Sequence, residues 1–124
     1  MSRKQPLILI VEDDELNRKL FREILSLDEI ETLEAEDAEQ GLILARQMRP
    51  DLILMDIQLP GMDGLAATRL LREDQELKDI RIIALSAHAM QNDIDEALKA
   101  GCNGYITKPV EVASFNQRVL AFLD

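Results

Sequence analysis

The chain of 124 residues contains little of several residue types, and each shortage excludes a class of protein. A single cysteine can form neither an internal disulfide nor a metal site built from several cysteines. Three phenylalanines and one tyrosine, with no tryptophan, are too few for a surface on which nucleic-acid bases stack. No apolar run approaches the length of a membrane span, and residues 1–6 lack the apolar segment of a signal peptide. We therefore expect a soluble, cytoplasmic protein that does not insert into membranes.

Positive charge is also scarce. The chain has 14 Lys and Arg residues and 24 Asp and Glu residues, so its net charge is −10 when the one histidine is neutral. Phosphate backbones and anionic lipid headgroups repel such a chain, so no nucleic-acid partner is expected. Hydrophobic residues make up 47% of the sequence, which is enough to build a core, and the length suits one domain.

Short apolar runs recur along the chain and predict strands. The runs at residues 7–11, 52–55 and 80–85 are nearly continuous, a weaker run covers 104–107, and residues 30–35 alternate between apolar and polar. Continuous runs are typical of parallel strands that are covered on both faces, whereas alternation is typical of a half-exposed strand. The sequence therefore predicts five strands, most of them buried.

Between the strands, apolar residues follow a helical period. The predicted buried stripe of the first helix consists of Leu16, Leu20, Ile24 and Leu27. A capping box of Asp37 and Gln40 begins the second helix, which carries Ala38, Leu42, Ala45 and Met48 and ends before Pro50. Helices are also predicted at 65–73 and 92–100, the latter closed by Gly101, and a last one carries the stripe Val112, Phe115, Val119 and Phe122.

The alternation of strand and helix, repeated five times, predicts an α/β fold. Such an order favours a single parallel sheet with right-handed crossovers and helices on both faces. We expect one domain at residues 7–124, preceded by a flexible segment at residues 1–6.

Polar residues stand where the predicted strands end. Glu12 and Asp13 end the first run, Asp56 the third and Ser86 the fourth, and Lys108 follows the fifth. Ligands of parallel sheets bind beyond the carboxyl ends of the strands, so these side chains should converge. Crowded carboxylates repel one another unless a cation offsets them, and an oxygen-rich site of this kind suits Mg²⁺.

Simpler roles exist for several of these residues. An acid after a strand is commonly a helix N-cap, and this is the favoured role of Asp14. Capping does not explain Asp56, because the next helix starts only after Gly64, and it does not explain Lys108. The lone His88 is more simply a loop residue than a catalyst or ligand. Cys102 is more simply a small buried side chain than a redox group.

Four motifs resemble the receiver domain of two-component response regulators, in the CheY-like superfamily. They are LILMDIQLPGMDG at 52–64, VEDD at 11–14, LSA around Ser86 and KP at Lys108, and the resemblance covers residues 7–123. It implies a doubly wound, flavodoxin-like sheet of five parallel strands in the order 2-1-3-4-5. It also implies a cis peptide bond between Lys108 and Pro109.

The resemblance implies a phosphoryl-accepting site that uses Mg²⁺ as its cofactor. Asp56 would be the phospho-acceptor that attacks the phosphohistidine of a sensor kinase. Asp13, Asp56 and the backbone carbonyl of Gln58 would hold Mg²⁺, with Glu12 acting through a bound water. The charges of the cation and of Lys108 would neutralise the transferred phosphoryl group.

The resemblance also implies a conformational switch. Ser86 would hydrogen-bond one phosphoryl oxygen and Lys108 would pair with another, and Tyr105 stands at the position of the family's switch aromatic. The alternative for Tyr105 is an edge-strand tyrosine with one end in water.

The partners follow from this resemblance. They are a sensor histidine kinase or phosphotransfer protein, and a downstream protein that binds the face formed by residues 92–118. The first helix, where kinases dock in this family, is the alternative contact surface. We expect a monomer or weak dimer without an attached output domain, which catalyses only its own phosphorylation and dephosphorylation.

Other functions remain as alternatives. The chain could be a phosphorelay intermediate or a receiver module from a hybrid kinase. An aspartyl-phosphate phosphatase is disfavoured, because Gln58 stands where such an enzyme needs a second acid. A flavodoxin-like cofactor binder is disfavoured, because the acids at 12–14 would repel a phosphate there.

Overall fold

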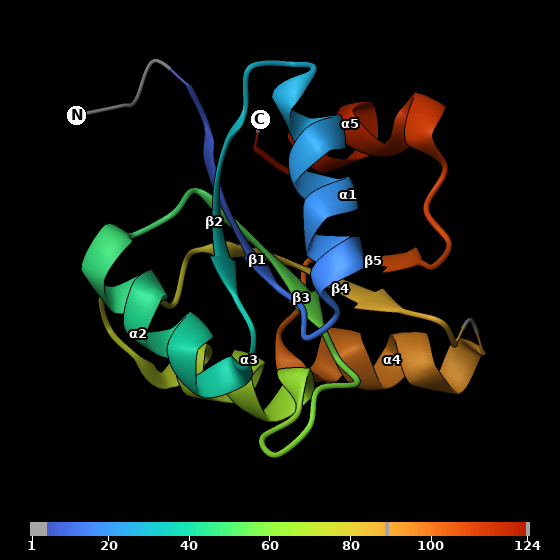
Figure 1. The fold of residues 1–124 in the computed structure, drawn as a ribbon. Coiled ribbons are helices and arrows are strands. Elements are labelled where there is room, and N and C mark those ends of the chain that lie inside the picture. The colour runs from blue at the N-terminus through green and yellow to red at the C-terminus, as the bar shows by residue number, and fades with distance from the viewer. Residues whose placement is uncertain (1–4, 89, 124) are drawn as a thin grey trace.

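A five-stranded parallel sheet forms the centre of the molecule in the computed structural model, which describes residues 5–88 and 90–123 (Figure 1). Its strands are β1 (Leu7–Val11), β2 (Glu31–Ala35), β3 (Leu52–Asp56), β4 (Arg81–Ser86) and β5 (Gly104–Thr107). The helices are α1 (Glu15–Ser26), α2 (Ala38–Met48), α3 (Gly64–Glu73), α4 (Gln91–Ala100), α5 (Val112–Leu120) and the short 3₁₀ helix η1 (Ala121–Leu123). The strand order β2-β1-β3-β4-β5 confirms the predicted fold class and topology.

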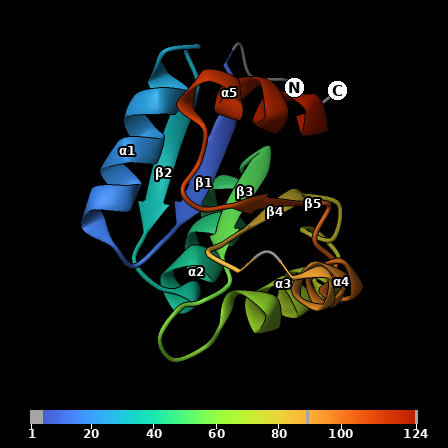
Figure 2. The same ribbon diagram turned by 90° about the vertical axis from the view of Figure 1, so that its right-hand side faces the viewer.

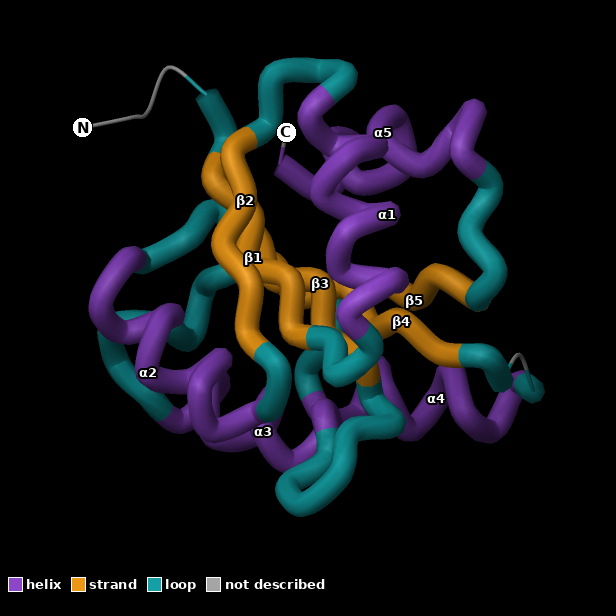
Figure 3. Tube along the Cα trace, viewed as in Figure 1, coloured by secondary structure: helices purple, strands orange, loops and turns teal. Residues whose placement is uncertain are grey.

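Helices cover both faces of the sheet, with α1 and α5 on one face and α2, α3 and α4 on the other (Figures 2 and 3). Successive residues of β1 face opposite layers. Ile8 and Ile10 pack with α1 and α5, while Leu9 and Val11 pack with the other three helices. Because both faces are covered, every residue of β1 is buried, and this explains its continuous apolar run.

The buried face of α1 differs from the predicted stripe. Leu16, Leu20 and Leu27 are exposed, the first and last by 76% and 75%, so that prediction was wrong for all but Ile24. The buried residues are Phe21, Ile24 and Leu25. The ring of Phe21 stacks on Phe115 of α5, with 5.6 Å between the centroids, and this contact decides which face of α1 turns inward.

Two other predicted stripe residues are also exposed. Met48 is the last residue of α2 and Val112 the first of α5, so each has helix neighbours on one side only. The remaining predicted stripe residues of the two helices are buried or half-buried, and Phe122 belongs to η1.

Side-chain capping contacts confirm the predicted starts of the first two helices. The Asp14 carboxylate accepts a hydrogen bond from the Leu16 N–H at 2.9 Å, and Asp37 accepts one from the Gln40 N–H at 2.8 Å. Gly101 ends α4 at a φ of 116°, a conformation that favours glycine. The peptide bond between Lys108 and Pro109 is cis, as the resemblance implies.

Parts of two predictions fall on residues that the structure does not describe. Residues 1–4 of the predicted flexible segment and Asp124 at the end of the predicted domain lie outside the described residues. None of the helices in the described part of the chain has the length and apolar character that a membrane crossing requires.

Candidate functional site

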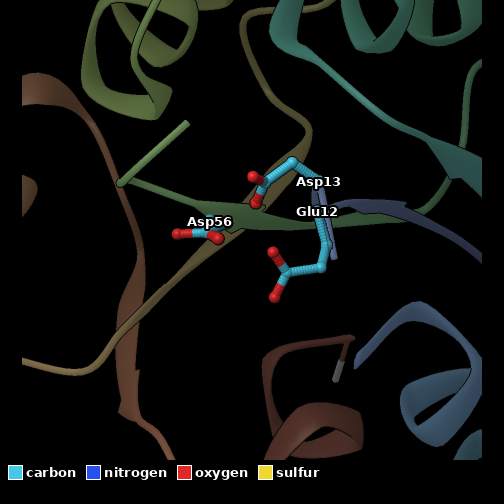
Figure 4. A group of neighbouring side chains, drawn as sticks. All are labelled: Glu12, Asp13 and Asp56. Atoms are coloured by element: carbon cyan, nitrogen blue, oxygen red, sulfur yellow. The ribbon is translucent and has the colours of Figure 1, made fainter. Parts of the chain in front are cut away.

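Three acids meet at the carboxyl edge of the sheet, between β1 and β3 (Figure 4). Glu12 and Asp13 directly follow β1, and Asp56 is the last residue of β3. The parallel strands pair Val11 with Met55, so their next residues lie side by side. One carboxylate oxygen from each acid lies within 4.8 Å of the others. The strand order reverses between β1 and β3, which is where sheets of this type bind ligands.

Two of these acids are buried. Glu12 is 1% exposed and Asp56 is 3% exposed, whereas Asp13 is open to solvent. Burial, reinforced by the neighbouring Asp56 carboxylate, raises the pKa of Glu12 to about 7, against the opposing effect of Lys108. The charged form of Glu12 is therefore disfavoured in this site, and a cation that enters the site would favour it.

Lys108 approaches the acids from the end of β5. Its Nζ donates to Glu12 Oε1 at 2.7 Å and to Asp56 Oδ2 at 3.1 Å. Burial alone would lower the pKa of Lys108, but the hydrogen bonds to these two carboxylates raise it above its ordinary value. The backbone N–H of Lys108 donates to the Ser86 carbonyl at 2.8 Å, so β4 and β5 hold the lysine in place together.

The donor set fits Mg²⁺. Three carboxylates lie together and two of them contact the Lys108 ammonium, while the exposed side of Asp13 leaves room for the waters that Mg²⁺ usually keeps. The Gln58 N–H donates to Asp56 Oδ1 at 2.8 Å, which fixes the Asp56 carboxylate. The Gln58 carbonyl as a ligand stays a prediction.

Asp56 is not a helix cap, in agreement with the sequence argument. The N-cap of α3 is Asp63, whose side chain accepts from the Ala66 N–H at 2.8 Å. Gly64 packs so tightly below the site that a Cβ there would lie 2.3 Å from the Asp56 carbonyl oxygen.

Ser86 and Tyr105 are linked through the loop that follows β4. The Ser86 Oγ is fully buried and accepts from the His88 N–H at 3.0 Å, while the Tyr105 hydroxyl donates to the His88 carbonyl at 2.7 Å. His88 itself is an exposed loop residue, as predicted. Tyr105 is half-buried on the edge strand β5, and its role as a switch stays a prediction.

Two residues of α1 contact the site and were missed in the sequence. Asn17 Nδ2 donates to Glu12 Oε1 at 3.1 Å, and Arg18 Nη1 donates to the Glu12 carbonyl at 2.8 Å. Both sit on the first turns of the helix that follows Glu12, where polar residues are ordinary. The sequence feature that could have identified them is their position, five and six residues after Glu12, on the part of α1 closest to the end of β1.

Cys102 lies apart from this site. It is buried, with its Sγ 3.8 Å from the Thr68 hydroxyl, which confirms the predicted packing role. Burial raises the pKa of the Cys102 thiol, although Thr68 and Arg72 act in the opposite direction.

A doubly wound parallel sheet with buried acids and a lysine at its switch point defines a class of small α/β proteins that bind a cation together with an anionic group. Residues 8–120 match the family described as "Response regulator receiver domain", and the chain belongs to this family. Receiver domains are signalling switches that bind Mg²⁺ at an acidic site.

Relatives agree with this assignment along most of the chain. The chain is 45% identical over 116 residues to the polar-differentiation response regulator DivK of Brucella anthropi, a match that covers 94% of both chains. DivK of Brucella abortus strain 2308 is 44% identical over the same length, again with 94% of both chains covered.

Solved structures give the same result. One is the receiver domain of a sensor histidine kinase from Pseudomonas aeruginosa, with a magnesium ion coordinated in its active site cleft. It has a TM-score of 0.88 and 34% identity, over 96% of this chain and 98% of that chain. Another is the receiver domain of a Saccharomyces cerevisiae response regulator, co-crystallised with a histidine phosphotransfer protein. It has a TM-score of 0.88 and 27% identity, over 95% of this chain and 88% of that one.

Proposed function

We propose that the chain is a phosphorylation switch in which Asp56 accepts a phosphoryl group from the phosphohistidine of a sensor histidine kinase or phosphotransfer protein. The observation that carries the proposal is the environment of the Asp56 carboxylate. One oxygen is held by the Gln58 N–H at 2.8 Å, and the other faces the Lys108 ammonium at 3.1 Å. A fixed, buried carboxylate beside a cation is suited to nucleophilic attack on phosphorus.

The other residues would stabilise the charge of the transferred group. Asp13, Asp56 and the Gln58 carbonyl would hold Mg²⁺, with Glu12 acting through a bound water, and the bound cation would neutralise charge on the phosphoryl oxygens. Lys108 would move its hydrogen bonds from the carboxylates to a phosphoryl oxygen, and the Ser86 hydroxyl would donate to another. Since the attacking carboxylate carries no proton, the chain needs no general base for this step.

We propose that phosphorylation of the chain transmits a signal and is not a step in the hydrolysis of a phosphorylated substrate. Gln58 occupies the place where aspartyl-phosphate phosphatases carry a second acid, so no carboxylic acid stands there to protonate a leaving group. The same chemistry suits an intermediate in a phosphorelay, and the yeast receiver domain bound to a phosphotransfer protein supports that second role. We further propose one receiver domain over residues 7–124, acting in the cytoplasm as a monomer or weak dimer.

Two surfaces are available to partners. The face formed by residues 92–118 carries a mixed polar rim of Asp93, Asp95, Glu96, Lys99, Glu111 and Arg118, which suits a transient interface with a downstream target. Exposed Leu16 and Leu20 on α1, with Leu27 directly after its end, offer apolar contacts to the protein that donates the phosphoryl group. The hydrogen bond from Tyr105 to the loop after β4 supports a connection between the site and the 92–118 face.

Intact-mass measurement after incubation with acetyl phosphate and Mg²⁺ tests the proposal. The wild-type chain should gain one phosphoryl group, and Asp56→Asn should gain none because it lacks the nucleophilic carboxylate. Asp63→Asn is the matched control, since asparagine caps a helix as well as aspartate does and Asp63 ends the loop that follows Asp56. Full phosphorylation of Asp56→Asn would overturn the assignment.

A further inference from the structure

Asn17 shares a carboxylate oxygen with the lysine of the site. Its Nδ2 donates to Glu12 Oε1 at 3.1 Å, and Lys108 Nζ donates to the same oxygen at 2.7 Å. The two donors come from α1 and from the end of β5, so they hold one oxygen from two elements. The same ammonium also reaches Asp56 Oδ2 at 3.1 Å. The positions of Glu12, Lys108 and Asp56 are therefore coupled.

The backbone of Glu12 is held independently of Asn17. Its N–H donates to the Ala35 carbonyl at 3.0 Å, and its carbonyl accepts from Arg18 Nη1 at 2.8 Å. Arg18 in turn pairs with Glu34, with Nε 3.5 Å from Oε1. Loss of the Asn17 amide would therefore leave the backbone of Glu12 in place and free only its side chain.

Among residues 5–88 and 90–123, the remaining hydrogen bond to the Glu12 carboxylate is too weak to replace Asn17. Its second oxygen, Oε2, accepts from the Asp14 N–H at 3.5 Å, which is the outer limit for a hydrogen bond. Without Asn17, the carboxylate could turn with Lys108 and draw the ammonium away from Asp56. Because the amide is neutral, it orients Glu12 without offsetting the negative charge that attracts a cation.

From these contacts we propose that Asn17 is a positioning residue, whose amide fixes the Glu12 carboxylate and, through the shared Oε1, the Lys108 ammonium in the arrangement that receives Mg²⁺ and the phosphoryl group. The inference rests on the proposed function of the site. Removing a group that hydrogen-bonds to and orients a side chain of a metal site commonly weakens metal binding by about 10- to 100-fold. Asn17 is half-exposed, so we expect a weakening of about 3- to 10-fold.

The test is a titration with Mg²⁺ alone, followed through the backbone amide chemical shifts of Asp13 and Asp56. Asn17→Leu keeps the approximate size and removes the donor, and it should weaken Mg²⁺ binding. Asn17→Gln keeps an amide donor and should bind Mg²⁺ more tightly than Asn17→Leu. Gln47→Leu, an exposed amide on α2, is the control for replacing an amide by leucine and should match the wild type.

A second readout separates positioning from a general loss of structure. At saturating Mg²⁺, Asn17→Leu should still be phosphorylated by acetyl phosphate more slowly than the wild type, because Lys108 is displaced, while its urea midpoint stays near the wild-type value. A wild-type chain that fails to bind Mg²⁺ would refute the proposed function. If the wild type binds Mg²⁺ but Asn17→Leu binds it equally tightly, the positioning role of Asn17 is overturned and the proposed function of the site is not. Equal weakening by Leu and Gln would also overturn it, since the donor would then be irrelevant.

Discussion

The two edges of the sheet surround their charged side chains in opposite ways, with half-buried Arg72 at one and buried Glu12 and Asp56 at the other. At the amino edge, where β4 and β5 begin, the Arg72 guanidinium donates to four fixed oxygens at 2.7–2.9 Å: the carbonyls of Gly101, Lys78 and Ile80 and the Asn103 Oδ1. At the carboxyl edge, Glu12 and Asp56 share a single ammonium. The Arg72 cation is thus surrounded by acceptors, whereas two buried carboxylates share one ammonium and otherwise accept from uncharged amides.

This difference separates stability from function within one small domain. The partners of Arg72 are mostly backbone carbonyls, which are uncharged and fixed in position. The hydrogen-bonding capacity of the Arg72 guanidinium is therefore used by the protein itself, without a ligand. The acids of the carboxyl edge repel one another and are relieved when a cation binds. Strain at a ligand site, held in place by a well-satisfied edge elsewhere, is a common arrangement in binding proteins.

The largest expected effect is at the amino edge. Arg72→Ala should lower the free energy of unfolding by about 2–4 kcal/mol, because it leaves carbonyls at the starts of β4 and β5 without their donor. Urea unfolding measures this loss. The exposed Arg69 on the same helix is the control, and Arg69→Ala should change stability by less than about 0.5 kcal/mol. Equal effects of the two substitutions would contradict the account of the amino edge.

The next effect is at the carboxyl edge and depends on the ligand. Under the proposed function Mg²⁺ would bind the folded chain and not the unfolded one, so at ten times its Kd it should stabilise the wild type by about 1.4 kcal/mol. Asp13→Ala should remove this stabilisation. It should leave the metal-free protein about as stable as the wild type, since Asp13 is exposed. Melting curves with and without Mg²⁺ check both statements, and an unchanged Mg²⁺ effect in Asp13→Ala would argue against this site.

The smallest effect concerns Cys102, which lies at the amino edge between two partners of Arg72, Gly101 and Asn103, and apart from the carboxyl-edge site. Because burial raises the pKa of its thiol, little of the reactive thiolate exists in the folded chain at about pH 8. Iodoacetamide should leave the native protein unmodified and label it fully in urea, as mass spectrometry would show, with Cys102→Ala as the blank. Rapid labelling of the native protein would show that the thiol is accessible and would contradict the packing role.

The sequence correctly predicted those features that depend only on the order and direction of the strands. Parallel strands end at one edge, so the convergence of Glu12, Asp56 and Lys108 follows from the order of the strands, although 96 residues separate the first from the last. The same reasoning identified the fold and the buried strands. Distances, and the sharing of one ammonium between two acids, required the structure.

The sequence was insufficient where packing chooses between alternatives. α1 has two overlapping apolar stripes, and the stack of Phe21 on Phe115 buries one of them and exposes Leu16 and Leu27. Arg72 binds a backbone carbonyl 29 residues away, so no local pattern distinguishes it from an ordinary polar residue of a helix surface. Asn17 lies five residues from Glu12, but this spacing alone does not show that its amide reaches the Glu12 carboxylate. Such contacts depend on the tertiary structure, so hydrophobic periodicity does not predict them.

The most direct test of the contrast between the two edges is a comparison of backbone amide chemical shifts before and after beryllofluoride, a phosphoryl mimic, is added with Mg²⁺. The account predicts changes around Asp56 and Ser86 that extend to the exposed side of the 92–118 face, and none at residues 5–7 and 49–51, where β1 and β3 begin. Changes confined to the neighbourhood of Asp56 and Ser86 would remove the proposed route to the 92–118 face. The absence of any change near Asp56, or the largest changes at the amino edge, would contradict the central claim that the carboxyl edge receives the phosphoryl group.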